Sequence, residues 1–225
     1  MTLELGGDAA CVENLRRCWS SRDISCVYDS AYTRQGFKTA FRVIGDDHDV
    51  ATVLTKYILE HYKGKRIAVI DDRTAYGQSF SDDVVKMLKT QGVEVVGREY
   101  GTAQTIDFRG ALTSLKSTRP GVVVYAGLDA QAGSIRKQMT ALGMGDVVLA
   151  GCAIETQQFI TLARGPATAE GTLSSESGYS LADMPKGKDF VNRFAKYGPT
   201  VLFRRMRTMP PGRLSKPCNR WLNQP

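Results

Sequence analysis

The stretch KRIAVIDDRTAYG, from Lys65 to Gly77, decides the fold of this chain. Its apolar run Ile67–Ile70 is continuous, which is typical of a strand buried on both faces of a parallel sheet. Residues 71–74 then turn the chain into polar sequence. Because ligands of open α/β sheets bind just beyond the carboxyl ends of strands, this stretch predicts an α/β domain with a site close to Tyr76.

Strand and helix patterns alternate around this stretch and are joined by short connections. Such alternation predicts a parallel sheet with right-handed crossovers. After Gly171 the pattern changes, and we expect a connection that leaves one lobe and leads to a last helix at Lys188–Lys196. The expected strands are Phe41–Gly45, Arg66–Ile70, Val93–Tyr100, Gly121–Tyr125 and Val147–Ala150, and the expected helices are Val53–Tyr62, Ser79–Gln91, Asp107–Ser117, Ala130–Leu142 and Glu155–Leu162.

Length and composition limit the possible classes of protein. With 225 residues, 42% of them hydrophobic, the chain is long enough for one large or two small domains. No apolar run approaches the ~20 residues that span a bilayer, and Met1–Gly7 lacks the basic start and apolar core of a signal peptide. The net charge of +7 divides into −2 in residues 1–30, +3 in residues 31–198 and +6 in residues 199–225. Because most of the excess lies in a proline-containing tail, we expect no nucleic-acid partner.

The five cysteines are also unevenly distributed. Cys11, Cys18 and Cys26 lie near the start, Cys218 lies in the tail, and Cys152 alone falls in the body of the chain. These spacings fit neither a zinc ribbon nor a redox pair, and an odd number leaves at least one thiol unpaired within a monomer. We therefore expect free thiols and no metal site.

The candidate reactive groups give little support to an enzyme. Asp71 and Asp72 could share a proton or a metal, but adjacent strand residues point to opposite sides, so we expect one acid to cap a turn and the other to be solvated. His48 and His61 stand in no catalytic motif, and the phosphate-loop patterns GxxxxGK[ST] and GxGxxG are absent. We predict that the chain is not an enzyme and uses no cofactor.

Tyr76 is the residue best suited to a binding site. Its amphipathic ring follows the carboxyl end of a strand, where it can cover an apolar ligand and donate a hydrogen bond. The alternative is a tyrosine that only packs its own loop, and ring type and turn position support the two interpretations about equally.

Six ordered segments are specific enough to carry a resemblance. They are TRQGFKTAFRVIGDD (Thr33–Asp47), KYILEHYKGKRIAVIDDRTAYGQ (Lys56–Gln78), DFRGALTSLK (Asp107–Lys116), VVVYAG (Val122–Gly127), RKQMTALGM (Arg136–Met144) and AEGTL (Ala169–Leu173). With them, the chain resembles the periplasmic branched-chain amino acid (leucine) binding proteins, the substrate-binding components of ABC importers. The resemblance extends from Tyr32 to Tyr197.

The resemblance implies an α/β, type I periplasmic-binding-protein fold, in which two doubly wound lobes with parallel sheets are joined by crossing strands. The second lobe would be mostly present and the first lobe largely missing. Residues 32–176 would form a leucine-binding-protein-like second lobe with its entry strand, and residues 177–198 a connection and helix toward the first lobe. Residues 1–31 and 199–225 are atypical, which fits a truncated or frame-shifted member.

The resemblance also implies ligand contacts. Tyr76 matches the tyrosine that lies over the ligand after the IDDxxxYG strand, and Gly127 with Leu128 aligns with a wall of the side-chain pocket. Where the family often has a carboxylate for the ligand's ammonium group, this chain has Cys152, with Glu155 nearby as a substitute. Because a buried ammonium without a paired charge costs several kcal/mol, we expect weak or absent affinity.

The implied function is that of a non-enzymatic solute-binding component, which closes two lobes around a branched-chain or similar amino acid. Its partners would be this amino acid and the membrane permease of an ABC importer, and it would act as a monomer in the periplasm. The alternative is a ligand-sensing regulatory or receptor module of the same fold. A preceding DNA-binding helix pair or a transmembrane span would favour that alternative, and neither is visible in the sequence.

Overall fold

A parallel sheet of five strands organises the chain. The computed structural model describes residues 22–23, 34, 36, 40–41, 45–154, 156–178 and 185–197. The strand order is β4-β3-β5-β6-β7 and every neighbouring pair is parallel, which confirms the predicted parallel sheet. A separate two-stranded parallel pair is formed by β1 (Arg22–Asp23) and β2 (Ala40–Phe41). The strands of the large sheet are β3 (Ile67–Asp71), β4 (Val95–Tyr100), β5 (Val122–Ala126), β6 (Val148–Cys152) and β7 (Leu173–Ser175).

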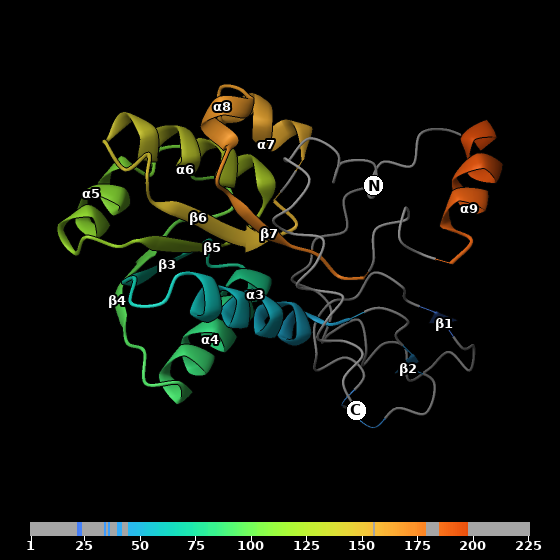
Figure 1. Ribbon diagram of the computed structural model, residues 1–225, viewed down its shortest axis with the longest axis horizontal. Helices are drawn as coiled ribbons and strands as arrows, with labels where there is room; N and C mark the ends of the chain where they lie inside the picture. The colour runs from blue at the N-terminus through green and yellow to red at the C-terminus, as the bar shows by residue number, and fades with distance from the viewer. Residues whose placement is uncertain are drawn as a thin grey trace.

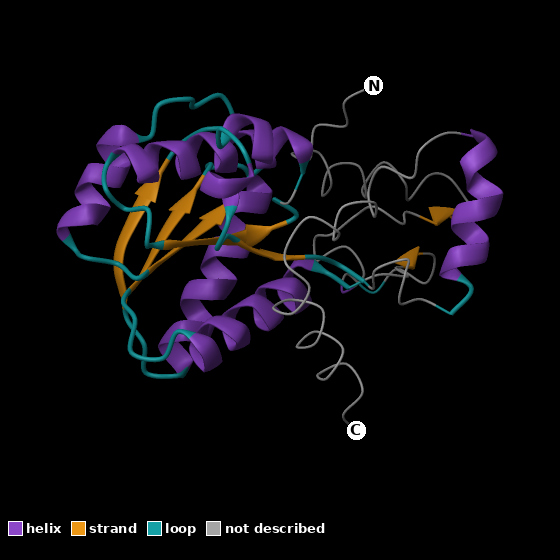
Figure 2. Cartoon of the chain, turned by 45° about the horizontal axis from the view of Figure 1, so that its top comes forward, coloured by secondary structure: helices purple, strands orange, loops and turns teal. Residues whose placement is uncertain are grey.

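Helices cover both faces of this sheet, as Figures 1 and 2 show. One layer consists of α3 (Asp47–His61) and α4 (Ala75–Thr90). The other consists of α5 (Arg109–Ser117), α6 (Asp129–Ala141), α7 (Gln157–Leu162) and α8 (Pro166–Ala169). The chain then continues to α9 (Gly187–Phe194) and the 3₁₀ helix η2 (Ala195–Tyr197). None of the described helices is long and apolar enough to cross a membrane.

Alternate residues of the central strands supply the two cores. In β3, Val69 packs toward the α3–α4 layer, whereas Ala68 and Ile70 pack toward the opposite layer. All five residues of β3 and of β5 are buried, as expected for strands covered on both faces. The largest fully buried side chains of the α3–α4 core are Ile58, Ile67, Phe80 and Leu88, and those of the other core are Ile70, Phe108, Leu112, Leu115, Tyr125, Ile135, Met139 and Phe159.

The structure differs from the expected elements mainly at helix starts. Helix α3 begins six residues before the expected Val53, because Asp46 accepts the Asp49 backbone N–H at 2.9 Å and Asp49 reciprocates in a capping box. Helix α4 begins at Ala75 instead of Ser79, because the Thr74 hydroxyl accepts the Gly77 backbone N–H. The first residues of α3 and α4 follow polar caps and do not show apolar spacing, so periodicity alone predicts the starts of these two helices too late.

Two further elements were not expected. Helix α8 begins with Pro166, and β7 adds a fifth strand at the edge of the sheet beside β6. The expectation of a connection directly after Gly171 was therefore wrong at Leu173–Ser175. Of the expected strand Phe41–Gly45, Phe41 belongs to β2, Gly45 lies in no strand, and residues 42–44 lie outside the described residues. The same holds for residues 1–21 and 24–31 and for the tail at 199–225.

Candidate functional site

The predicted contact residues Tyr76, Gly127, Leu128 and Cys152 lie at or just after the carboxyl ends of the strands. The chain enters α3 and leaves β7 at this end of the sheet (Figure 1). Helices that return between parallel strands run against them, so α4 and α6 also begin here, after β3 and β5. In open α/β sheets, ligands bind in the crevice at this edge.

The turn after β3 is built by two buried carboxylates that have separate tasks. Asp72 accepts the Thr74 backbone N–H at 3.0 Å and the Thr74 hydroxyl at 2.6 Å, which confirms the expected turn capping. Asp71 pairs with the Arg98 guanidinium at 3.1 Å. The expectation that one acid is solvated was wrong, because Asp71 and Asp72 are only 0% and 2% exposed. Their side chains are engaged by different partners and do not form a dyad.

Tyr76 lies in the first turn of α4 and is partly buried. Its ring packs against Phe80, with 5.9 Å between the ring centroids. Its hydroxyl donates a hydrogen bond to the thiol of Cys152 at the end of β6. Burial raises the pKa of Tyr76 well above its ordinary value, and the nearby Cys152, Asp47 and Asp72 add to this effect. Tyr76 is therefore a neutral hydrogen-bond donor at this edge.

Cys152 is the second predicted site residue that the structure brings to this cluster. Burial raises the pKa of its thiol to about 12, and the hydrogen bond from Tyr76 only partly opposes this shift. Glu176 and Asp47 raise the pKa of Cys152 further. The thiol is therefore protonated near neutral pH, whereas metal binding and nucleophilic attack both require the thiolate. No group of three metal-ligating side chains occurs within the described part of the chain.

Gly127 and Leu128 follow β5 on the other side of the β3 turn. A Cβ atom on Gly127 would lie 2.2 Å from the Tyr125 hydroxyl oxygen and 2.9 Å from a carboxylate oxygen of Asp72, so only glycine fits here. Leu128 precedes α6 and is 49% exposed, so its side chain is free to form part of an apolar wall. A Cβ atom on Gly77 would lie 2.2 Å from a carboxylate oxygen of Asp72 and 2.8 Å from the Ala126 carbonyl oxygen, so the end of β5 lies against the first turn of the helix that carries Tyr76.

The remaining predicted contact, Glu155, lies outside the described residues. A different glutamate, Glu176, was missed by sequence reasoning. It directly follows β7, whose last residue Ser175 is the register partner of Cys152. The Ser174 hydroxyl donates to a Glu176 carboxylate oxygen at 3.4 Å, and burial raises the pKa of Glu176 to about 7. The only available signal was an acid directly after a short β-rich run, LSSE.

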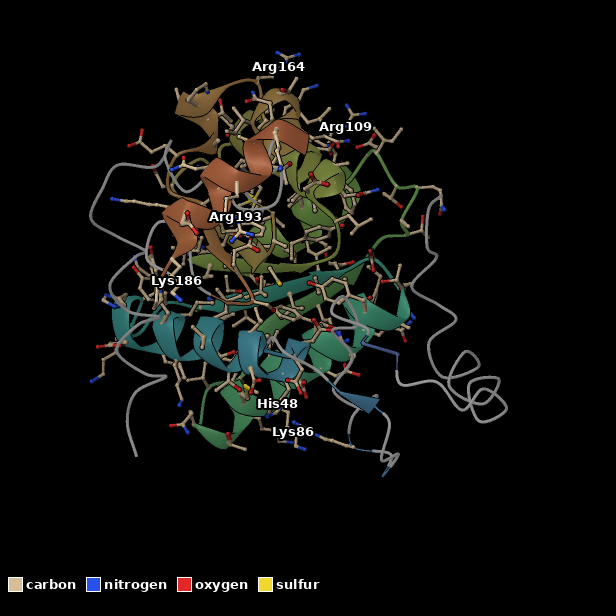
Figure 3. All side chains as sticks on the ribbon, turned by 90° about the vertical axis from the view of Figure 1, so that its right-hand side faces the viewer. His48, Lys86, Arg109, Arg164, Lys186 and Arg193 are labelled. Carbon is tan, nitrogen blue, oxygen red and sulfur yellow. The ribbon has the colours of Figure 1, made fainter. Side chains whose placement is uncertain are left out.

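Two acidic side chains lie close to the Cys152 thiol at this edge. Figure 3 views the molecule from this side, with Arg109 and Arg164 on one helical layer, His48 and Lys86 on the other, and Lys186 and Arg193 at α9 in front of them. The edge itself has Asp47 at the start of α3 and Glu176 after β7, both close enough to act on the Cys152 thiol. These two acids would favour a positively charged ligand group close to the thiol.

Comparisons with known proteins agree with this architecture. The family model described as "Periplasmic binding protein" matches residues 20–207, which is most of the chain. The chain therefore belongs to the periplasmic binding protein family. It is 34% identical over 167 residues to Leu/Ile/Val-binding protein homolog 1 of Brucella suis, which covers 74% of this chain and 44% of the relative.

Solved structures show the same fold. The leucine-binding protein LivK of Thermotoga maritima has a TM-score of 0.66 at 22% identity, over 75% of this chain and 49% of that one. A branched-chain amino acid ABC transporter protein of Thermus thermophilus, solved with bound valine, has a TM-score of 0.61 at 22% identity, over 73% of this chain and 43% of that one. The predicted family resemblance and type I periplasmic-binding-protein fold are confirmed. The chain spans less than half the length of these relatives.

Proposed function

We propose that this chain is a solute-binding component of an ABC amino-acid importer and binds a branched-chain or similar amino acid. The observation that carries the proposal is the joining of Tyr76 and Cys152 at the carboxyl edge, in a chain that is 34% identical to a Leu/Ile/Val-binding protein homolog. The family model describes binding proteins and no enzyme, which supports a role without catalysis.

Each predicted contact has a role in this proposal. The Tyr76 ring covers the ligand and its hydroxyl oxygen accepts a hydrogen bond, while Leu128 contacts the apolar side chain and Gly127 permits the tight turn that precedes Leu128. Cys152 contributes a neutral surface where a carboxylate would pair with the ammonium group. Affinity is expected to be impaired, because the neutral Cys152 thiol gives the ligand's ammonium group no paired charge at this position.

The cellular setting remains a prediction that follows from family membership. The proposed partners are the amino acid and the membrane permease of the importer, and the proposed location is the periplasm. A monomeric state and the lack of a nucleic-acid partner also stay predictions. The regulatory or receptor module of the same fold remains the alternative function, and no observation favours it.

Titration calorimetry of the full chain with L-leucine, L-isoleucine and L-valine tests the proposed function. We expect binding that is lost or weakened at least about tenfold in Tyr76→Ala, because the ring supplies both apolar contact and a hydrogen bond. Tyr62→Ala is the matched control, because Tyr62 is a partly buried tyrosine at the far end of α3. Absence of binding by the wild type would contradict the function, and equal binding by Tyr76→Ala would remove Tyr76 from the site.

A further inference from the structure

Glu176 differs in its electrostatic environment from the carboxylates that form ion pairs in the described structure. Asp71 pairs with Arg98, Asp46 with Arg34, and Asp107 with Arg109. Within the described residues, Glu176 pairs with no cation, and its one hydrogen bond comes from the Ser174 hydroxyl at 3.4 Å. Because a partly buried carboxylate without a cation is unfavourable, this group would gain from a positive charge supplied from outside.

Glu176 lies beside the predicted contacts Cys152 and Tyr76. Ser175 pairs in register with Cys152, and the Ala153 backbone N–H bonds the Ser175 carbonyl oxygen at 2.9 Å. The Glu176 carboxylate after β7 is thus held near the Cys152 thiol at the end of β6, and the two groups interact electrostatically. Tyr76 donates to the same thiol from α4. A tyrosine hydroxyl, a neutral thiol and an acid with no cation among the described residues therefore lie together at this edge.

A purely structural role explains Glu176 less well. The Ser174 hydroxyl already accepts the Ile154 backbone N–H at 3.2 Å, so the loop after β6 is held by the serine and not by the acid. A neutral glutamine would keep the hydrogen bond from Ser174 and remove the burial cost of the charge. If Glu176 had only a structural role, its charge would be a disadvantage without a compensating benefit.

We propose that Glu176 selects α-amino acids over the corresponding carboxylic acids, because its carboxylate pairs with the ligand's ammonium group beside Tyr76 and Cys152. This inference rests on the proposed function. It goes beyond it by assigning the ammonium contact to Glu176, the residue after β7, whereas the family resemblance suggested Glu155.

The proton balance of binding provides an independent signature. Burial raises the pKa of Glu176 to about 7, so near neutral pH the free chain holds about half a proton there, and an ammonium ligand would expel it. The titratable groups nearby are Cys152 on β6, Tyr76 on α4 and Asp47 on α3. Cys152 and Tyr76 have pKa values raised far above 7 and stay neutral, so affinity for leucine should increase from pH 6 to pH 8.

The test compares L-leucine with 4-methylpentanoate, which lacks only the amino group, by calorimetry on the full chain. We expect the wild type to favour leucine, and Glu176→Gln to weaken leucine binding at least about tenfold without weakening that of the acid. Glu170→Gln is the matched control, because Glu170 is an exposed glutamate just before β7. Repetition in buffers of different ionisation enthalpy should show proton release in the wild type and none in Glu176→Gln.

Two other outcomes would contradict either the assignment of Glu176 or the proposed function. If the wild type binds both ligands equally, or Glu176→Gln keeps full leucine affinity, the selectivity assignment fails while the solute-binding function stands. If the wild type binds no amino acid, the proposed function fails and this inference fails with it. Should Glu176→Gln lack the thermal transition of the wild type, Glu176→Asp serves instead, and it should keep the preference for leucine with reduced affinity.

Discussion

Replacement of Arg136 by methionine should strongly destabilise the chain, because its guanidinium binds four backbone carbonyls. Arg136 lies on α6 and is only 5% exposed. Its Nε donates to Thr168 O at 2.7 Å and its Nη1 to Val147 O at 2.9 Å. Its Nη2 donates to Gly145 O and to Glu170 O, each at 3.1 Å. One side chain therefore joins the entry of β6 to the segment that leads into β7.

The expected magnitude follows from these contacts. A hydrogen bond to a charged group contributes roughly 1.5–3 kcal/mol, so four of them would sum to about 6–12 kcal/mol if they were independent. Burial of the guanidinium costs several kcal/mol, which offsets part of that sum, and burial accordingly lowers the pKa of Arg136. Methionine leaves four carbonyls without their donor, so we expect a net loss of about 3–5 kcal/mol in the free energy of unfolding.

Urea denaturation followed by circular dichroism measures this loss. Lys137→Met is the matched control, because Lys137 is the next residue of α6 and is exposed, and its change should stay within about 0.5 kcal/mol. Arg136→Lys should fall between the two, since an ammonium group cannot reproduce the planar fork of donors. If Arg136→Met unfolds within about 1 kcal/mol of the wild type, the four hydrogen bonds do not stabilise the native state as argued.

Three further predictions concern the carboxyl edge. Because the pKa of Glu176 rises from 4.5 to about 7 on folding, its contribution to stability is full below pH 4.5 and is lost as the pH rises through 7. Urea titrations over this pH range should show a loss of about 1–2 kcal/mol in the free energy of unfolding, a value discounted for the partial exposure of the side chain. The same titrations of Glu176→Gln should show no such dependence on pH. Gly127→Ala should lower the free energy of unfolding by about 1–3 kcal/mol in the same assay, since the new Cβ would overlap the Tyr125 hydroxyl. The control Gly110→Ala, on the open side of α5, should leave the free energy of unfolding unchanged or raise it by up to about 1 kcal/mol. With the pKa of its thiol raised to about 12, Cys152 should react slowly with iodoacetamide at pH 8, as measured by peptide mass spectrometry, and rapidly in urea; fast reaction in the folded chain would contradict its burial.

The strands and the layer architecture could be predicted because their signals are local. The run Ile67–Ile70 is apolar throughout, and a strand covered by helices on both faces requires that composition. Helix starts were predicted less well, since the caps Asp46 and Thr74 are polar and do not contribute to apolar spacing. Strand β7 was missed because its three residues are defined by pairing with β6, more than 20 residues earlier in the chain.

The candidate site was predicted in part for the same reason. Tyr76 was selected from its position after a strand and Cys152 from the family resemblance, but the hydrogen bond between them joins two elements that are far apart in the sequence. The expected solvation of one acid in the Asp71–Asp72 pair failed, because the partners that bury both acids come from β4 and from the turn itself. Burial and partner identity depend on neighbours that the local sequence does not specify.

By itself, the sequence determined the class of fold, the strand that leads to the site and the family of the chain, because apolar periodicity and ordered motifs act over short distances. Only the tertiary structure decided which charges remain unpaired. Glu176 is an ordinary acid in the segment LSSE until β7 pairs with β6, and that pairing places its carboxylate beside a neutral thiol with no cation of its own among the described residues. The electrostatic character of the edge is a property of this arrangement, because charges interact through space and through the solvent that packing excludes.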